Sequence, residues 1–345
     1  MQVMVTGGTG FVGSHTVAAL LAAGHTVRLL VRAKTKLDAA LRPLGVDPAR
    51  VDAVEGDVTE EASVERALEG CDAVLHAANV FAFRGRREQV RALERVNVAG
   101  TRIVLGAAVR RRLDPVVHLS SIAALYGGVD RGRTFDERTP LGDPYGPYMR
   151  SKRDAEAVAR EFQADGHAVV VVQPGGVWGP HDPYAGESAQ AALQIARGQV
   201  PITMTGGFGI VDVRDVAAVC AAAMKPGRGP RIYPAFGEYI RYCDLHRTVS
   251  DAAGLRRLNL PLPPDAVMLT SFPFMWLLET LGLPYLPTEG LYMCWRDHPV
   301  DCRYTTRELG VRFRPARDAA RDTVRWLIES GRLRAPGIRG QTASD

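Results

Sequence analysis

The sequence has few cysteines, and their placement excludes several classes of protein. The chain of 345 residues contains five cysteines, with no CxxC pair and no neighbouring histidines at the spacing of a zinc site. The odd number and irregular spacing exclude a disulfide framework, and no metal site is predicted. We expect reduced, mostly buried thiols, as in a cytoplasmic protein. They are Cys71, Cys220, Cys243, Cys294 and Cys302.

Signals for nucleic-acid binding, secretion or a membrane span are also missing. The net charge is +5, but the basic residues are dispersed and no nucleic-acid-binding motif accompanies them, so we interpret them as solvated surface. The first expected strand begins at the start of the chain and leaves no room for a signal peptide. The most apolar segment, 266–286, is interrupted by two prolines, a glycine and a glutamate, whereas a spanning helix needs about 20 clean apolar residues.

The segment 266–286 instead predicts a helix that is buried or faces a substrate, and a peripheral contact with a membrane stays open. Large apolar side chains in this segment and shortly after it are candidates for lining an apolar pocket, with ordinary core packing as the alternative. They are Phe272, Phe274, Met275, Trp276, Leu277 and Trp295.

What the sequence does contain is an alternation of short apolar runs and helical stretches in its first half. This alternation predicts an α/β fold with a Rossmann-type, doubly wound parallel sheet covered on both faces. We expect this domain over 1–175, with part of 212–235 returning to the sheet, then a smaller, irregular substrate-binding lobe over 176–335 and a flexible tail over 336–345. The expected strands are 2–6, 25–31, 51–56, 72–77, 115–120 and 168–174, with long helices at about 11–23, 86–112 and 148–165.

A glycine-rich loop lies between the first strand and the first helix. Its glycines are spaced GxxGxxG, which allows a tight turn, a close approach of backbone to a pyrophosphate, and close packing of helix on strand. The N-terminus of the following helix offers unpaired N–H groups to phosphates. The position at the start of a βαβ unit therefore predicts a dinucleotide site. The cofactor-binding residues expected here are Gly7, Thr9, Gly10, Phe11, Val12 and Gly13.

The loop after the second strand lacks the acidic residue that an NAD site normally places there. It carries Arg32 and Lys36 instead, with no carboxylate before Asp38. A guanidinium binds a 2′-phosphate in a fork, whereas a carboxylate repels it. The sequence therefore predicts NADP(H), with NAD(H) less favoured. The alternative is that both residues are solvated loop cations.

Two further strand ends indicate the same cofactor site, because ligands gather at the carboxyl ends of parallel strands. Asp57 and Val58 close the third strand, where the carboxylate can accept a hydrogen bond from the adenine amino group or instead cap the next helix. Ala77 and Ala78 follow the fourth strand, and their small side chains allow the cofactor to lie close.

Tyr148 and Lys152 are four residues apart and share one face of a helix. An ammonium one turn from a phenol lowers the pKa of the phenol, which can then exchange a proton with a substrate oxygen. Ser121 follows Ser120 at the end of the fifth strand, where a hydroxyl can orient a substrate carbonyl. Asn97 is unusual inside a helix, and we expect it to fix a water that relays protons from the lysine.

Together these motifs resemble the extended short-chain dehydrogenase/reductases, and most of all their dihydroflavonol-reductase-like and 3β-hydroxysteroid-dehydrogenase-like members. TGGTGFVG, LHAAN, VNVAGT, LSSIAALYG, YMRSK and QPGGVWGP occur in the family's order over nearly the whole chain. In sugar-epimerase-like members the catalytic serine would fall at Ile122, so the sequence departs from that branch. The resemblance implies a catalytic set and two residues that face the nicotinamide. The catalytic set is Ser121 as the serine, Tyr148 as acid/base, Lys152 as its partner and Asn97 as the structural-water residue, and the nicotinamide-facing residues are Pro174 and Val177.

The function expected from these features is that of an NADP(H)-dependent carbonyl reductase or alcohol dehydrogenase. Its substrate would be small and apolar, of an aromatic, terpenoid or steroid kind. One alternative is a nucleotide-sugar epimerase or dehydratase with tightly held NAD, for which Arg231 and Arg241 are loose candidates to bind the diphosphate. Another is a catalytically silent dinucleotide-binding scaffold. A homodimer also stays open.

Overall fold

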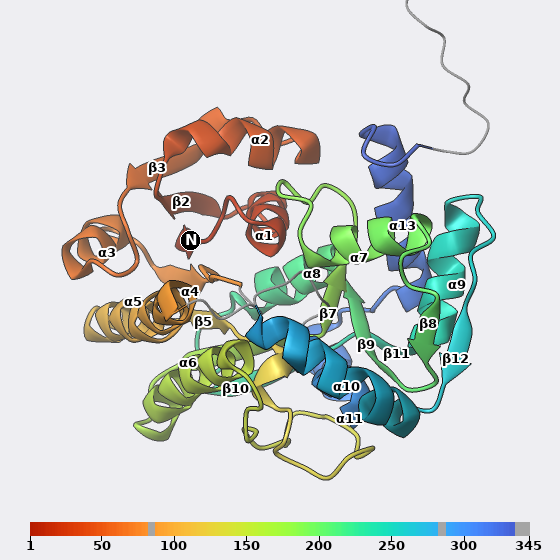
Figure 1. Ribbon diagram of the computed structural model, residues 1–345. Coiled ribbons are helices and arrows are strands. Elements are labelled where there is room, and N and C mark those ends of the chain that lie inside the picture. The colour runs from red at the N-terminus through yellow and green to blue at the C-terminus, as the bar shows by residue number, and fades with distance from the viewer. Residues whose placement is uncertain (82–86, 282–287, 335–345) are drawn as a thin grey trace, which may run out of the picture.

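A seven-stranded parallel sheet in the order β10-β6-β5-β4-β1-β2-β3 forms the centre of the molecule (Figure 1). The structure is a computed structural model and describes residues 1–81, 87–281 and 288–334. The strand order reverses between β1 and β4, and in such sheets the crevice at the carboxyl ends of these strands is the usual ligand site. The strands are β1 (Gln2–Thr6), β2 (Thr26–Val31), β3 (Val51–Glu55), β4 (Ala73–His76), β5 (Val116–Leu119), β6 (Val169–Pro174) and β10 (Arg231–Ala235).

Helices cover both faces of the sheet because successive strand residues point to opposite sides and most of them are apolar. Val3 and Val5 pack on the face that carries α1 (Phe11–Ala22), α2 (Leu37–Leu41) and α8 (Val213–Ala223). Met4 packs on the opposite face, together with α3 (Glu61–Leu68), α5 (Gly100–Arg110) and α6 (Pro147–Ala164). The expected doubly wound α/β fold is therefore confirmed.

The helix expected over 86–112 is not uniform. It consists of α4 (Arg87–Ala92), a π-helical segment η4 (Leu93–Ala99), and α5. A π-helical turn holds one extra residue and is often found at functional sites. Asn97 lies in this segment. Short 3₁₀ turns complete this half of the chain as η1 (Lys34–Lys36), η2 (Arg42–Leu44), η3 (Pro48–Arg50) and η5 (Ile122–Ala124).

After β6 the chain builds two small sheets and returns once to the large one. β10 pairs in parallel with β6, and the small sheets have the orders β11-β9-β7 and β12-β8. A second core is formed mainly by α7, α9 and α13. The elements are β7 (Gly176–Trp178), α7 (Glu187–Ala196), β8 (Ile202–Met204), β9 (Gly207–Asp212), β11 (Glu238–Arg241), α9 (Tyr242–Ala252), β12 (Leu260–Leu262), α10 (Pro264–Thr280), α11 (Thr288–Arg296), α12 (Arg303–Leu309) and α13 (Ala316–Glu329).

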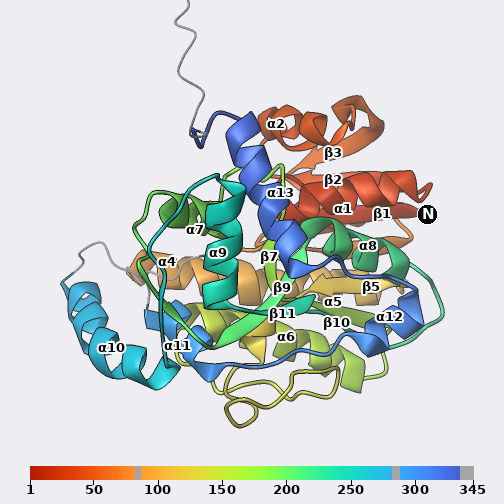
Figure 2. The same ribbon diagram turned by 90° about the vertical axis from the view of Figure 1, so that its right-hand side faces the viewer.

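The helix α10 is not buried, which was one of the two placements expected for it, and it runs through Pro273 without a break. The side chains of Leu269, Phe274 and Trp276 are 80%, 62% and 56% exposed. Figure 2 shows α10 at the margin of the molecule beside α11. Its apolar residues are distributed around the whole helix. Because only one side of the helix packs on a neighbour, the apolar residues on its other sides lie on the surface.

Ordinary core packing is therefore wrong for the exposed residues of α10, which include Leu277 at 48%. The side chains of Phe272 and Met275, and the proposed tail 336–345, lie outside the described residues. No helix in the described part of the chain is long and apolar enough to cross a membrane. All five cysteines are free thiols, and four of them are buried.

Candidate active site

The glycine-rich loop packs too tightly for side chains at two of the three glycines of its GxxGxxG motif. Gly7 has φ +73°, and a Cβ atom there would lie 2.6 Å from the carbonyl oxygen of Ala77. A Cβ atom at Gly13 would lie 2.0 Å from the carbonyl oxygen of Gly7. Gly10 is the N-cap of α1 and provides no side-chain cap, so the first N–H groups of this helix stay available to an anion. This loop fits the pyrophosphate of a dinucleotide.

Tyr148 lies at the same rim of the sheet, in the first turn of α6. The helix begins after Gly146, and Pro147 takes the first position, where its missing N–H costs nothing. The side chain of Tyr148 is buried, and its phenol makes a hydrogen bond with the side chain of Ser121. The rings of Phe81 and Tyr148 are 4.5 Å apart between centroids. The structure therefore brings the expected serine and tyrosine together.

The pKa of the Tyr148 phenol is raised, where the sequence argument expected a lowering by Lys152. Burial is the largest cause, the hydrogen bond with Ser121 opposes it, and the charges of Glu289 and Glu187 raise the pKa further. Burial also lowers the pKa of Lys152 to about 8, partly offset by the charge of Glu156. Sequence spacing carries no information on burial, and burial is the larger effect here.

The side chain of Asn97 connects the π-helical segment to α6 and to the chain after β4. Its amide oxygen accepts a hydrogen bond from the backbone N–H of Val80 at 2.8 Å, and its amide nitrogen donates to the carbonyl of Val80 and to the hydroxyl of Ser151, each at 3.0 Å. Ser151 is the neighbour of Lys152 on α6. Asn97 thus holds the segment after β4 against the catalytic helix.

The chain is similar to proteins of a known family. The model of the NAD dependent epimerase/dehydratase family matches residues 3–235. A protein of Synechocystis sp. named "Putative dihydroflavonol 4-reductase" is 32% identical over 339 residues, which are 95% of this chain and 94% of that protein. The chain belongs to the NAD dependent epimerase/dehydratase family.

Other relatives of the family agree with this assignment. A 3 beta-hydroxysteroid dehydrogenase/Delta 5-->4-isomerase of Mycobacterium tuberculosis is 31% identical over 187 residues, 52% of this chain and 48% of that protein. The crystal structure of gox2253 has a TM-score of 0.80 at 30% identity and covers 96% of this chain and 99% of that one. DesIV, a dTDP-glucose 4,6-dehydratase from Streptomyces venezuelae with NAD and TYD bound, has a TM-score of 0.71 at 25% identity and covers 95% and 97%.

The resemblance to extended short-chain dehydrogenase/reductases is thereby confirmed, and the protein is an enzyme of this family. Its relatives use a nicotinamide dinucleotide, and the DesIV structure contains NAD. These relatives give no support for NADP(H) over NAD(H).

The predicted 2′-phosphate contacts lie on the loop after β2, at the carboxyl edge of the sheet. Arg32 is exposed, and its guanidinium has no hydrogen bond or ion pair with another described residue. Lys36 is also exposed, and its Nζ lies 5.8 Å from the centre of the Tyr184 ring. Both cations are exposed on this loop, and only Lys36 has a described contact, with the ring of Tyr184.

The remaining predicted cofactor contacts follow β3, β4 and β6. The Asp57 carboxylate accepts hydrogen bonds from the backbone and hydroxyl of Thr59, at 2.9 and 2.8 Å, so one oxygen serves a local turn. Ala77 and Ala78 follow β4 beside Gly7. Buried Val58 lies within the same turn, buried Pro174 ends β6, and half-buried Val177 lies in β7.

A directional chain of hydrogen bonds links the glycine loop to the π-helical segment. The hydroxyl of Thr101 donates to the carbonyl of Asn97 at 2.6 Å, so it accepts from Nε2 of His76 at 3.0 Å. Nδ1 of His76 must then accept the hydroxyl proton of Thr6, at 2.8 Å. Burial lowers the pKa of His76 to about 3, and the charge of Lys152 lowers it further, so the ring is neutral at physiological pH.

Glu156 is a buried carboxylate one turn beyond Lys152 that the sequence analysis missed. It accepts hydrogen bonds from Ser120 at 2.5 Å, from Gln173 at 2.7 Å and from both Nε and a terminal nitrogen of Arg160, at 2.9 and 2.6 Å. Ser120 follows β5 and Gln173 lies near the end of β6, whereas Arg160 lies on α6 itself. Glu156 therefore ties the catalytic helix to the sheet directly beneath the rim. A helical glutamate four residues before an arginine resembles a surface ion pair, so the sequence contained no signal of this role.

Of the two loose candidates for a sugar-nucleotide diphosphate, Arg231 does not lie at this rim. It pairs with Val170 at the start of β6, which is the amino end of the sheet, opposite to the glycine loop. The guanidinium of Arg241 is already bound to Asp244 at 2.7 Å.

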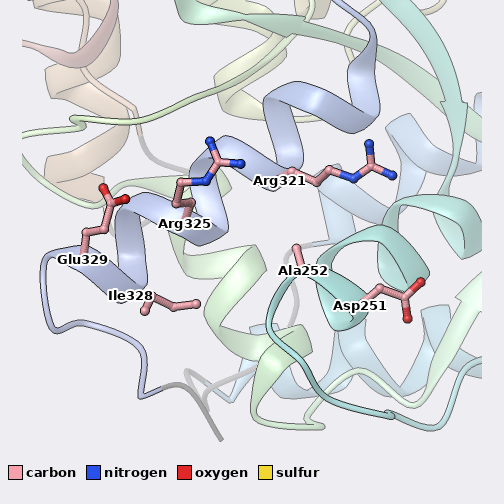
Figure 3. Close-up of a pocket in the computed structure, with 6 residues that line it drawn as sticks. All are labelled: Asp251, Ala252, Arg321, Arg325, Ile328 and Glu329. Atoms are coloured by element: carbon pink, nitrogen blue, oxygen red, sulfur yellow. The ribbon is translucent and has the colours of Figure 1, made fainter. Parts of the chain in front are cut away.

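A hollow between α9 and α13 is not part of the site either. Figure 3 shows the arginines and carboxylates that line it. Arg321 pairs with Asp318 and Arg325 with Asp322, each at 3.1 Å, and none of the residues that line the hollow is a predicted site residue.

Proposed function

We propose that the protein is an NADP(H)-dependent oxidoreductase that reduces a ketone or aldehyde, or oxidises a secondary alcohol, on an apolar substrate. The observation that carries this proposal is the hydrogen bond between Ser121 and Tyr148 at the rim that also holds the glycine-rich loop. A serine–tyrosine pair beside a dinucleotide site is suited to proton exchange with a carbonyl or alcohol oxygen.

The cofactor would be held by the glycine loop at its pyrophosphate and by Lys152 at the nicotinamide ribose, with Pro174 and Val177 against the nicotinamide. When bound, it supplies or accepts the hydride. Tyr148 gives the proton that the substrate oxygen needs on reduction and takes it back on oxidation. Ser121 orients that oxygen, and its hydrogen bond strengthens as negative charge develops there.

The preference for NADP(H) rests on charge at the end of β2. Arg32 is exposed and makes no ion pair with another described residue, and the loop contains no acid before Asp38. Such a guanidinium is suited to a 2′-phosphate.

The apolar character of the substrate rests on the surroundings of the phenol. Phe81 lies against Tyr148 and is 40% exposed, so an aromatic face borders the reacting position. The names of two relatives, a dihydroflavonol reductase and a hydroxysteroid dehydrogenase, refer to ring-containing compounds of this kind.

The test is Tyr148→Phe, with Tyr145→Phe as a matched control three residues earlier. Tyr148→Phe keeps the ring but removes the transferable proton, so kcat for a panel of apolar ketones should fall about 10²–10⁴-fold while NADPH binding persists. Tyr145 is 42% exposed and stacks on Tyr292, and its phenylalanine variant should keep most activity. Near-normal reduction by purified Tyr148→Phe would exclude this mechanism.

A further inference from the structure

We propose that Glu289 is a positioning residue that holds the start of the catalytic helix and sets the pH range in which Tyr148 transfers a proton. This inference rests on the proposed role of Tyr148 as acid/base. Glu289 lies on α11, is 2% exposed, and is about 140 residues away from the tyrosine in sequence.

The contacts of Glu289 complete the hydrogen bonding of the first turn of α6. Its carboxylate accepts the backbone N–H of Tyr148 at 3.3 Å and that of Met149 at 2.5 Å. Pro147 has no N–H to satisfy, and the N–H of Arg150 already donates to the carbonyl of Gly146 at 3.0 Å. Helices usually satisfy these donors with a nearby serine, threonine or aspartate. Here a buried carboxylate from a distant helix satisfies them at the catalytic residue itself.

Gly146 provides the space for this carboxylate. A Cβ atom at position 146 would lie 2.5 Å from Cδ of Glu289 and 2.6 Å from Oε2. The backbone of Gly146 is extended, with φ −131°, so its conformation does not itself require glycine. The requirement for glycine arises from Glu289.

The carboxylate of Glu289 also acts on the phenol through its negative charge. The groups with a described effect on the phenol include the hydroxyl of Ser121 after β5 and the carboxylates of Glu289 on α11 and Glu187 on α7. Lys152 lies one turn further along α6. Both carboxylates raise the pKa of the phenol in addition to its burial. An uncharged residue at 289 would destabilise the phenolate less, so the pKa of Tyr148 would fall.

The experiment is the pH profile of kcat for alcohol oxidation, which requires the deprotonated phenol and therefore rises with pH. In Glu289→Gln the amide oxygen can still accept one N–H but the charge is gone, and the rising limb should move to lower pH by about one unit. Glu289→Asp keeps the charge on a shorter side chain, so it should lower kcat while the rising limb stays at the pH of the wild type. Glu308→Gln, which changes a carboxylate on α12, should leave kcat and the pH of the rising limb unchanged.

Gly146→Ala tests the inference without changing a charge, should Glu289→Gln fold poorly. Its methyl group displaces the carboxylate, so the limb should again move to lower pH, and in the Glu289→Gln background it should add no further shift. A uniform loss of kcat at every pH, with a lower Tm and an unmoved limb, would show that Glu289 only supports the fold. Activity retained by Tyr148→Phe would instead overturn the proposed function, so the two failures are distinguishable.

Discussion

The helices α1 and α10 are both apolar around most of their circumference, yet one is buried and the other is exposed. In α1, even the polar residues Ser14 and Thr16 have no exposure, because the helix packs both on the sheet and against α8. In α10, Leu269 and Phe274 face the surface, because α11 is its main packing partner. The comparison teaches that composition makes a helix able to be buried, whereas its neighbours decide whether it is.

The largest expected effect comes from truncating one leucine in each helix. Leu20→Ala in α1 removes a fully buried side chain and leaves a cavity, so the free energy of unfolding should fall by about 2–5 kcal/mol. Leu269→Ala in α10 removes a side chain that is 80% exposed and should change stability by about 0.5 kcal/mol or less. Urea denaturation with an unchanged m value measures both. An equal loss of unfolding free energy in the two variants would mean that α10 is covered in solution.

The difference between local sequence and packing neighbours also separates the features that the sequence could predict from those that it could not. Each of the six expected strands appears within two residues of its predicted bounds, because apolar runs between turns are a local signal. The GxxGxxG loop and the Tyr148–Lys152 pair were found for the same reason, since their residues are close in sequence. The exposure of Trp276 was not predictable, because it depends on which element lies opposite.

Three features of the site depend on contacts between distant segments. Glu289 satisfies backbone groups about 140 residues away, and no spacing rule connects the two. Glu156 is fully buried, although its sequence neighbourhood resembles a solvated helix face. The raised pKa of Tyr148 follows from burial, which overrides the lysine one turn away. Local pattern therefore located the reacting residues, but tertiary packing sets their chemistry.

A smaller effect is expected at the cofactor end of the sheet. Arg32→Ala should weaken NADPH binding by about 1–3 kcal/mol, the value of a hydrogen bond to a charged group, and leave NADH binding nearly unchanged. Arg42→Ala is a suitable control, because its guanidinium already pairs with Asp38 at 2.7 Å. Titration of cofactor fluorescence measures both affinities. Equal losses for the two cofactors, or a wild type that prefers NADH, would contradict the assignment of Arg32 to the 2′-phosphate.

A change in stability as small as that of Leu269→Ala is expected at Trp276, where the effect should instead appear in binding to lipid vesicles. Trp276→Ser should alter the free energy of unfolding by about 0.5 kcal/mol or less, since the side chain is 56% exposed.

We propose that α10 makes a peripheral membrane contact, because exposed tryptophan, phenylalanine and leucine suit the boundary between headgroups and acyl chains. The helix contains no lysine or arginine, so binding of the wild type to phosphatidylcholine vesicles should be insensitive to salt. Trp276→Ser should reduce co-sedimentation, whereas Tyr184→Ser, which removes an aromatic ring of similar exposure from another region, should not. A wild type that does not sediment, together with a Trp276→Ser variant whose KM rises for bulky substrates more than for small ones, would place α10 on the substrate path instead.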